Sequence, residues 1–120
     1  MIEKYKQIVN LLLQLTSDRS QSWEKTSGNE YKTNIGKNYI SIRYHEASNF
    51  AIISNSKSDS TSIDLLLWNE AGEVIDEINA EKGTSDFSSL FVLYEEARRS
   101  YGQVYDRLDE IIVDLNAKMG

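Results

Sequence analysis

A long amphipathic pattern in the C-terminal third limits most strongly what this chain can fold into. From Phe87 to Leu115, apolar residues return every three or four positions, which is the spacing of one face of an α-helix. Thr84, Ser85 and Asp86 directly before it are helix-capping residue types, and an acid in the first turn complements the helix dipole. The sequence therefore predicts a long helix over about residues 86–117, and other parts of the fold must cover its apolar side.

The predicted helix is longer than a sheet of ordinary strands can cover. It would measure about 45 Å at 1.5 Å per residue, whereas six-residue strands span about 20 Å. Its far half, Val104 to Leu115, therefore needs another neighbour. Gly102 interrupts the stripe and costs about 1 kcal/mol relative to Ala, so it marks either a kink or a close approach of another backbone. A kink at Gly102 or a second copy of the protein would supply the missing neighbour. We predict a homodimer on this ground.

The rest of the chain predicts one more helix and a run of strands. Ile2 to Leu15 has helical apolar spacing that ends near Thr16, and alternating β-branched and aromatic residues follow. Because Leu65 to Trp68 is apolar on both faces, it should lie centrally with a helix on one side. The predicted strands are Trp23–Thr26, Glu30–Ile35, Tyr39–His45, Ile63–Trp68 and Glu73–Ile78, with residues 51–54 as a further short candidate and a Ser-rich loop over 55–61.

These elements predict an α+β fold in a single domain, residues 1–120. An antiparallel meander of four to five strands is covered on one face by the N-terminal helix and the long C-terminal helix, in the order α-β-β-β-β-α. A length of 120 residues suits one core. The chain has no Cys, and its first apolar run is too short and too polar for a bilayer span or a secretory signal. We expect a cytoplasmic protein that does not bind membranes.

Charge is distributed unevenly and argues against nucleic acid as a partner. The net charge is −6. Residues 1–60 hold eight Lys and Arg against six Asp and Glu, whereas residues 61–120 hold five against thirteen. Binding to phosphates requires clustered basic residues, which are absent. An acidic second half favours a partner with a basic surface instead.

Motifs that carry catalysis, metals or cofactors are missing from the sequence. His45 is the only histidine, and there is no Gly-rich phosphate loop, His-Glu zinc motif or Cys pair. We expect no enzyme activity, no cofactor and no metal site, and we expect His45 at the surface or on an edge strand. A hydrolase built on paired carboxylates would require two acids with opposed pKa shifts in one cleft.

The residues predicted to bind a partner protein lie on the C-terminal helix. Asp106, Glu110 and Asp114 repeat at i and i+4, which places three carboxylates on one helical face. Such a row is typical of a solvated face, although it is also able to ligate a hard cation. Together with Tyr101 and Tyr105, it predicts a non-catalytic interaction module of the acidic accessory, immunity or inhibitor type. Asp109 lies on another face, where we expect it to pair with a basic residue of the first helix or the sheet.

A small-molecule site is the alternative function. It would occupy a cleft between the sheet and the C-terminal helix, near Trp68, Tyr94 and Arg98, with a volume of roughly 300 Å³ or more. For Arg98 itself we favour a structural ion pair with an acid such as Asp76, since a long stem packs on apolar surface while the guanidinium reaches outward. Anion binding by Arg98 is the other reading.

One set of residues is spread over nearly the whole chain and specifies its fold. It consists of Trp23, Thr26, Tyr31, Thr33, Ile35, Gly36, Ile40, Ile42, the turn 69–72, Ile75, the segment 93–99 and the run 108–115. This set resembles that of a group of short, uncharacterised bacterial proteins, and the likeness implies a bacterial or phage-like source, without an activity. The element order is similar to that of double-stranded RNA-binding domains, but Thr84 to Phe87 stand where those domains need basic residues.

Overall fold

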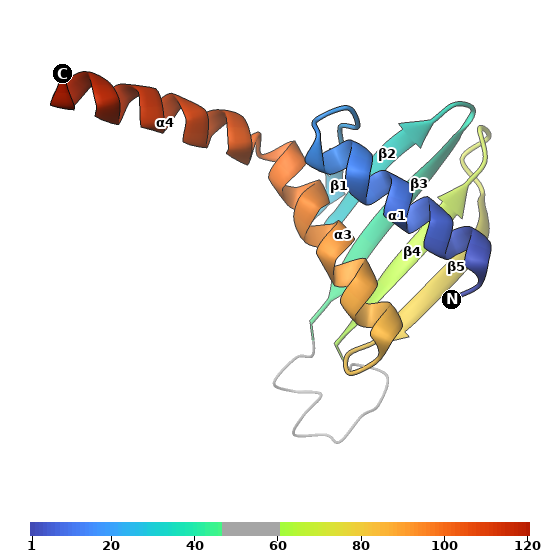
Figure 1. The fold of residues 1–120 in the computed structure, drawn as a ribbon. Coiled ribbons are helices and arrows are strands. Elements are labelled where there is room, and N and C mark those ends of the chain that lie inside the picture. The colour runs from blue at the N-terminus through green and yellow to red at the C-terminus, as the bar shows by residue number, and fades with distance from the viewer. Residues whose placement is uncertain (47–60) are drawn as a thin grey trace.

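A computed structural model describes residues 1–46 and 61–120 and shows helices packed on one face of an antiparallel sheet (Figure 1). The predicted α+β class is confirmed, and the described residues form one helix, five strands and two helices in that order. The elements are α1 (Glu3–Ser17), β1 (Glu24–Ser27), β2 (Glu30–Ile35), β3 (Asn38–His45), β4 (Ser62–Trp68), β5 (Val74–Glu81), α3 (Ser85–Tyr101) and α4 (Val104–Met119). The strand predicted at 51–54 and nearly all of the loop predicted at 55–61 lie outside the described residues.

The sheet is a meander in which sequential strands are neighbours, in the order β1-β2-β3-β4-β5. All four pairings are antiparallel. Gly36 and Gly72 occupy the turns after β2 and β4 with φ of 61° and 82°, a backbone region that glycine enters without steric cost. These glycines therefore allow the tight turns that join β2 to β3 and β4 to β5.

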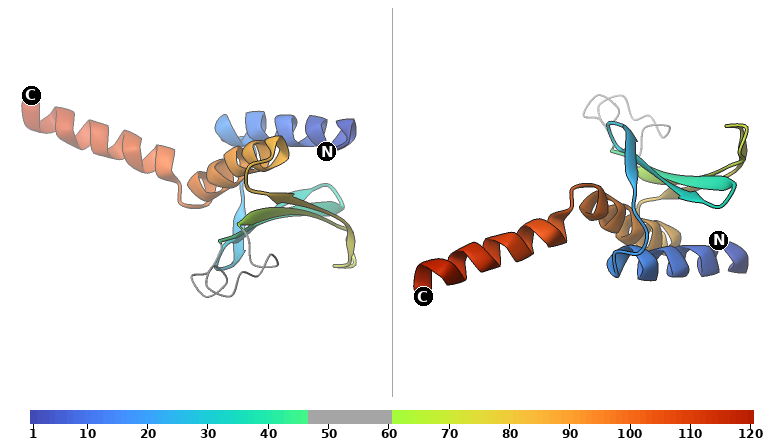
Figure 2. Two further views of the ribbon diagram at one scale, coloured as in Figure 1. Left: turned by 90° about the horizontal axis from the view of Figure 1, so that it is seen from below. Right: turned by 90° about the horizontal axis from the view of Figure 1, so that it is seen from above.

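The core lies between the sheet and the pair α1 and α3, which cover the same face (Figure 2). Leu90, Leu93 and Ala97 of α3 are fully buried against it. On β4, Leu65 and Leu66 point to opposite faces, and both are buried, as the sequence predicted for a central strand. The buried apolar side chains on the helix-covered side include Val9, Leu12, Tyr31, Ile40, Ile42, Ile63, Leu65 and Ala80.

The predicted continuous C-terminal helix is divided into two helices, which is a correction to the sequence analysis. α3 ends at Tyr101, and α4 begins at Val104. Gly102 keeps a right-handed conformation, whereas Gln103 adopts the left-handed region with φ 52° and ψ 39°. The change of direction therefore occurs at Gln103, directly after the glycine. Of the two alternatives for covering the far half, the kink is present, but it turns α4 away from the sheet (Figure 1).

The ends of the packed helices follow the sequence signals. The Thr84 hydroxyl accepts a hydrogen bond from the Phe87 amide at 3.1 Å, so it caps α3. α1 ends at Ser17, one residue beyond the predicted end. Within residues 1–46 and 61–120, none of the helices has the length and hydropathy of a membrane span.

Candidate functional site

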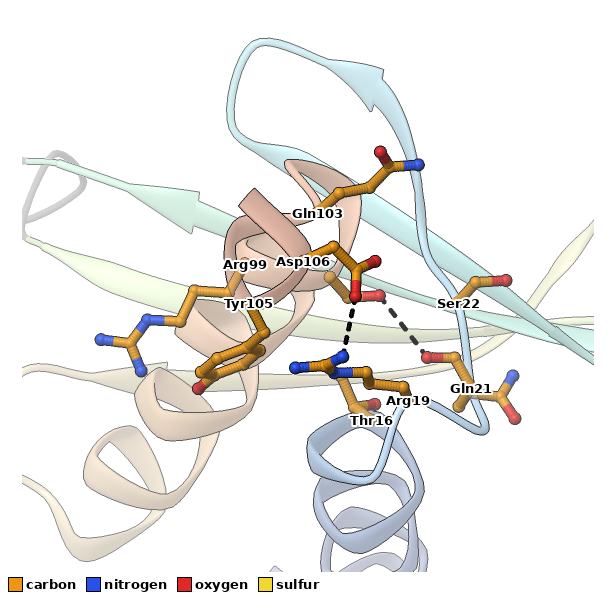
Figure 3. Close-up of a pocket in the computed structure, with 9 residues that line it drawn as sticks. Thr16, Arg19, Gln21, Ser22, Arg99, Gln103, Tyr105 and Asp106 are labelled. Carbon is orange, nitrogen blue, oxygen red and sulfur yellow. Dashed lines mark hydrogen bonds and ion pairs between the residues drawn. The ribbon is translucent and has the colours of Figure 1, made fainter. Parts of the chain in front are cut away.

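The first turns of α4 are attached to the body of the protein by Arg19, which follows α1. Its guanidinium contacts Asp106 Oδ1 at 2.8 Å and Asp109 Oδ2 at 3.3 Å, and it lies 5.8 Å from the centre of the Tyr105 ring. Figure 3 shows Arg19 reaching toward Asp106 from the end of α1. The expected pairing of Asp109 with a basic residue is thus made by Arg19, two residues past the end of the first helix. We call these contacts the Arg19 clamp.

Two further contacts fix the start of α4 relative to α3. The Tyr105 hydroxyl donates to Glu96 Oε1 at 3.2 Å, and Arg107 Nε donates to the carbonyl of Gly102 at 3.2 Å. Tyr105 and Asp106 were predicted to bind a partner, but the structure uses both of them in intramolecular contacts. A partner-binding surface on α4 would therefore have to involve other residues of the helix.

A small cavity lies where α1, α3 and α4 meet (Figure 3). Its volume is about 190 Å³, which is below the roughly 300 Å³ at which pockets for small organic ligands begin. Gln21 crosses its edge and donates to Thr33 and to the carbonyl of Asn34. The cavity is best explained as a gap at a three-helix junction. Its lining consists of Thr16, Arg19, Gln21, Ser22, Arg99, Ser100, Gln103, Tyr105 and Asp106.

The apolar side of α4 is exposed along its whole length. Leu108, Ile111, Ile112 and Leu115 have exposed fractions of 48%, 52%, 55% and 54%, and Met119 has 88%. We call these five residues the α4 stripe. Among the residues that the structure describes, α4 contributes none to the core. Successive residues of a helix are about 100° apart. The centre of the stripe therefore lies more than a quarter turn around α4 from both Asp106 and Asp109. The Arg19 clamp thus holds α4 by its acidic side, and the stripe faces away from the body.

The other predicted partner-binding residues keep accessible positions. Glu110 and Asp114 are exposed, and neither makes an ion pair with any described residue. Tyr101 is half exposed, although its ring lies 5.8 Å from that of Tyr31. Of the predicted partner-binding residues, Tyr105 and Asp106 thus make intramolecular contacts, whereas Tyr101, Glu110 and Asp114 are exposed.

The residues proposed for a ligand cleft do not come together, which corrects the alternative prediction. Tyr94 is buried on the helix side of the sheet, with its ring 5.6 Å from Tyr31 and 5.4 Å from Tyr44. Trp68 lies on the other side of the sheet, where it stacks on Tyr39 and donates to Ser41 Oγ at 2.9 Å. The sheet itself separates the two aromatic side chains.

Arg98 makes a structural ion pair, as predicted, but its partner is not Asp76. Arg98 contacts Glu95 at 2.8 Å, three residues earlier on the same helix. Asp76 instead accepts a hydrogen bond of 2.5 Å from the Tyr5 hydroxyl of α1. Burial, together with Asp76, raises the pKa of Tyr5 to about 12, and the hydrogen bond from Tyr5 lowers the pKa of Asp76. The hydroxyl of Tyr5, rather than the guanidinium of Arg98, contacts Asp76 because α1, and not α3, lies over this part of β5.

The sequence analysis missed a row of polar residues on the sheet face opposite the helices. Glu30, Arg43, Asp64 and Asn79 occupy paired positions on four adjacent strands. Asp64 is 3% exposed, and it accepts hydrogen bonds from Arg43 at 3.0 Å and Asn79 at 2.5 Å. The sequence signal for this row was Asp64, an acidic residue within the otherwise largely apolar strand β4.

His45 completes this row, with Nε2 2.8 Å from Asp64 Oδ2. The side chain is half exposed at the end of β3, as predicted for a surface residue, but β3 is a central strand. Burial alone would raise the pKa of Asp64, and the hydrogen bonds from Asn79, Arg43 and His45 outweigh it and lower that pKa. In the described parts of the chain, no three His, Cys, Asp or Glu residues are grouped in a way that could hold a metal ion.

Comparison with known proteins returns no family model, no curated protein and no solved structure that matches this chain. The resemblance to short bacterial proteins therefore remains a prediction.

Proposed function

We propose that this chain is a non-catalytic protein-interaction module that contacts its partner through α4. The observation that carries the proposal is that α4 is held at its base by the Arg19 clamp while the whole α4 stripe is exposed. A projecting helix with an uncovered apolar side is the arrangement expected of an acidic accessory, immunity or inhibitor-type protein that acts by docking.

Energetic considerations support a bound state for α4. A helix of 16 residues is marginally stable in water without tertiary contacts, and contiguous exposed apolar surface is typical of interaction sites. A partner that covers the α4 stripe would stabilise the helix and remove apolar area from water at about 25 cal/mol per Å². The stripe is thus the surface on which association gains most.

Charge indicates the nature of the partner surface. Asp114 lies at the edge of the stripe, and Glu110 lies further round, on the acidic side of the helix. Neither has an ion pair among the described residues, and the second half of the chain is strongly acidic. Electrostatic complementarity favours at least one basic group on the partner opposite these carboxylates. The association should accordingly weaken as salt is added.

Two substitutions on the same helix test this function. Ile112→Asp places a charge in the stripe, whereas Val113→Asp places the same charge at the next position, which points away from the stripe and where Val113 is 66% exposed. Tagged full-length chains are purified from the source cells, and any co-purifying protein is then titrated against each purified chain. We expect Val113→Asp to bind like the original chain and Ile112→Asp to bind at least about tenfold more weakly.

The same titrations define what would contradict the proposal. Equal binding by both variants would show that α4 is not the contact element. A chain that associates neither with another protein nor with itself would remove the function altogether.

A further inference from the structure

We infer that the partner of the α4 stripe is a second copy of this chain, packed antiparallel, α4 against α4. The inference rests on the proposed function, since it takes α4 as the contact element and names what covers it. Three observations carry it: the spacing of the stripe, the positions of the charges at its edge, and the direction in which α4 projects.

The spacing suits a pair of helices. Val104, Leu108, Ile111 and Leu115 follow one another at intervals of four, three and four residues, which is the alternation of the two core positions in a coiled coil. Ile112 and Met119 widen the seam on one side. A single partner helix of matching length can therefore cover the stripe.

The charges select an antiparallel arrangement. Arg107 and Asp114 lie seven residues apart on the same edge of the seam. When Leu108 packs opposite Ile111 of the second copy, Arg107 comes opposite Asp114 of the second copy, and two-fold symmetry makes this ion pair twice. A parallel pair would instead place Arg107 beside Ile112 and Asp114 beside Met119 of the other helix, leaving both charges against apolar side chains. Within one chain Arg107 is recorded donating through Nε, to the Gly102 carbonyl, so its terminal guanidinium nitrogens are the basic group that the acidic edge requires.

The direction of α4 allows two copies to meet. The helix points away from the sheet and from α1 in all three views (Figures 1 and 2), and the Arg19 clamp occupies its opposite side. In this register Val104 lies opposite Leu115 of the second copy, so the two helices overlap over residues 104–115, about 18 Å at 1.5 Å per residue. The two bodies lie at opposite ends of the pair, and the last turn of each α4 extends past the start of the other. The pair would bury roughly 1,000 Å² at most, which is near the small end of specific interfaces, so the dimer should dissociate in the micromolar range.

Sedimentation equilibrium of the full-length chain across the micromolar range tests this inference. We expect a reversible monomer–dimer equilibrium that Ile111→Asp abolishes and Val113→Asp preserves. Thermal unfolding followed by circular dichroism should show that both variants keep the folded body, which α4 does not help to pack.

Charge reversal tests the antiparallel alignment. Arg107→Asp alone and Asp114→Arg alone should each weaken the dimer about tenfold, because two attractive pairs become repulsive. The double variant should recover the original dissociation constant, since exchanging the two charges restores an attractive pair at both ends of the seam.

Each contrary result has a definite meaning. A monomer at every concentration, or a dimer that Ile111→Asp leaves intact, overturns the inference. Failure of the double variant to recover overturns the antiparallel pair. If the chain stays monomeric but another protein binds the original chain and Val113→Asp, and not Ile112→Asp, the proposed function stands and only the identity of its partner is wrong.

Discussion

Replacing Asp64 by Asn tests the claim that a buried carboxylate organises the far face of the sheet. Asp64 is 3% exposed and receives hydrogen bonds from Arg43, His45 and Asn79. Asparagine keeps the shape and one oxygen acceptor but loses the charge, and its amide nitrogen cannot accept from Arg43 or His45.

The expected loss can be bounded from these contacts. Hydrogen bonds to a charged group contribute about 1.5–3 kcal/mol each. Arg43 and His45 are 38% and 47% exposed, so water replaces much of what they lose. We therefore expect Asp64→Asn to lower the free energy of unfolding by about 2 kcal/mol, which for 120 residues corresponds to about 8 °C in Tm.

Urea unfolding at neutral pH measures this loss, with Glu70→Gln as a matched control in the exposed β4–β5 turn. The control should change the free energy of unfolding by less than about 0.5 kcal/mol. If Asp64→Asn loses no more than Glu70→Gln does, the polar row is not a stabilising network and the reasoning fails.

The stability lost in Asp64→Asn should also depend on pH. Because the pKa of Asp64 is lower in the folded state than in the unfolded chain, its contribution is complete above the unfolded value of about 3.9 and is lost as the pH falls through the folded value. The stability difference between the original chain and Asp64→Asn should therefore shrink as the pH falls below about 4. A difference that is independent of pH throughout would contradict the assignment.

Three further substitutions probe the contacts that place α1, α3 and α4. Tyr5→Phe removes the hydrogen bond to Asp76 and should cost about 1 kcal/mol in urea unfolding. Since the pKa of Tyr5 is raised to about 12, that contribution should be complete below about pH 10 and lost as the pH rises through 12, which absorbance titration of the tyrosinate can follow. Thr84→Ala removes the cap of α3 and should cost about 1 kcal/mol, whereas Thr84→Ser should cost much less. Arg19→Ala releases the base of α4, so hydrogen exchange should accelerate in α4 while exchange in α3 stays unchanged.

The sequence alone was sufficient for the class of fold and for most element positions. Hydrophobic periodicity located α1 and all five described strands to within a residue or two at most ends, because period 3.6 and period 2 each imply one buried face. Turn residues such as Gly36 and Gly72 indicated where the chain reverses, since few other residues adopt their backbone angles. These are local properties, and local physics determines them.

The division of the C-terminal helix was only half visible. Gly102 marked the place, but the left-handed turn is made by Gln103, and nothing in the sequence gives its direction. In the structure, contacts of the first turns of α4 accompany that direction. They include Arg19 with Asp106 and Asp109, almost ninety positions further along the chain, and Tyr105 with Glu96. The sequence therefore predicted a surplus of apolar helix, but the tertiary structure decided where that surface lies.

The side-chain partners were likewise decided by the tertiary structure. Arg98 and Asp76 each had a plausible opposite charge, yet the crossing of α1 over β5 gave Asp76 a tyrosine and left Arg98 with a neighbour on its own helix. Asp64 gained its three donors only because strand register aligned Arg43 and Asn79 beside it. Hydrophobic periodicity indicates which face of a helix or strand is buried. Which side chain contacts that face depends on strand register and helix crossing angle, and these are set only when the whole chain packs.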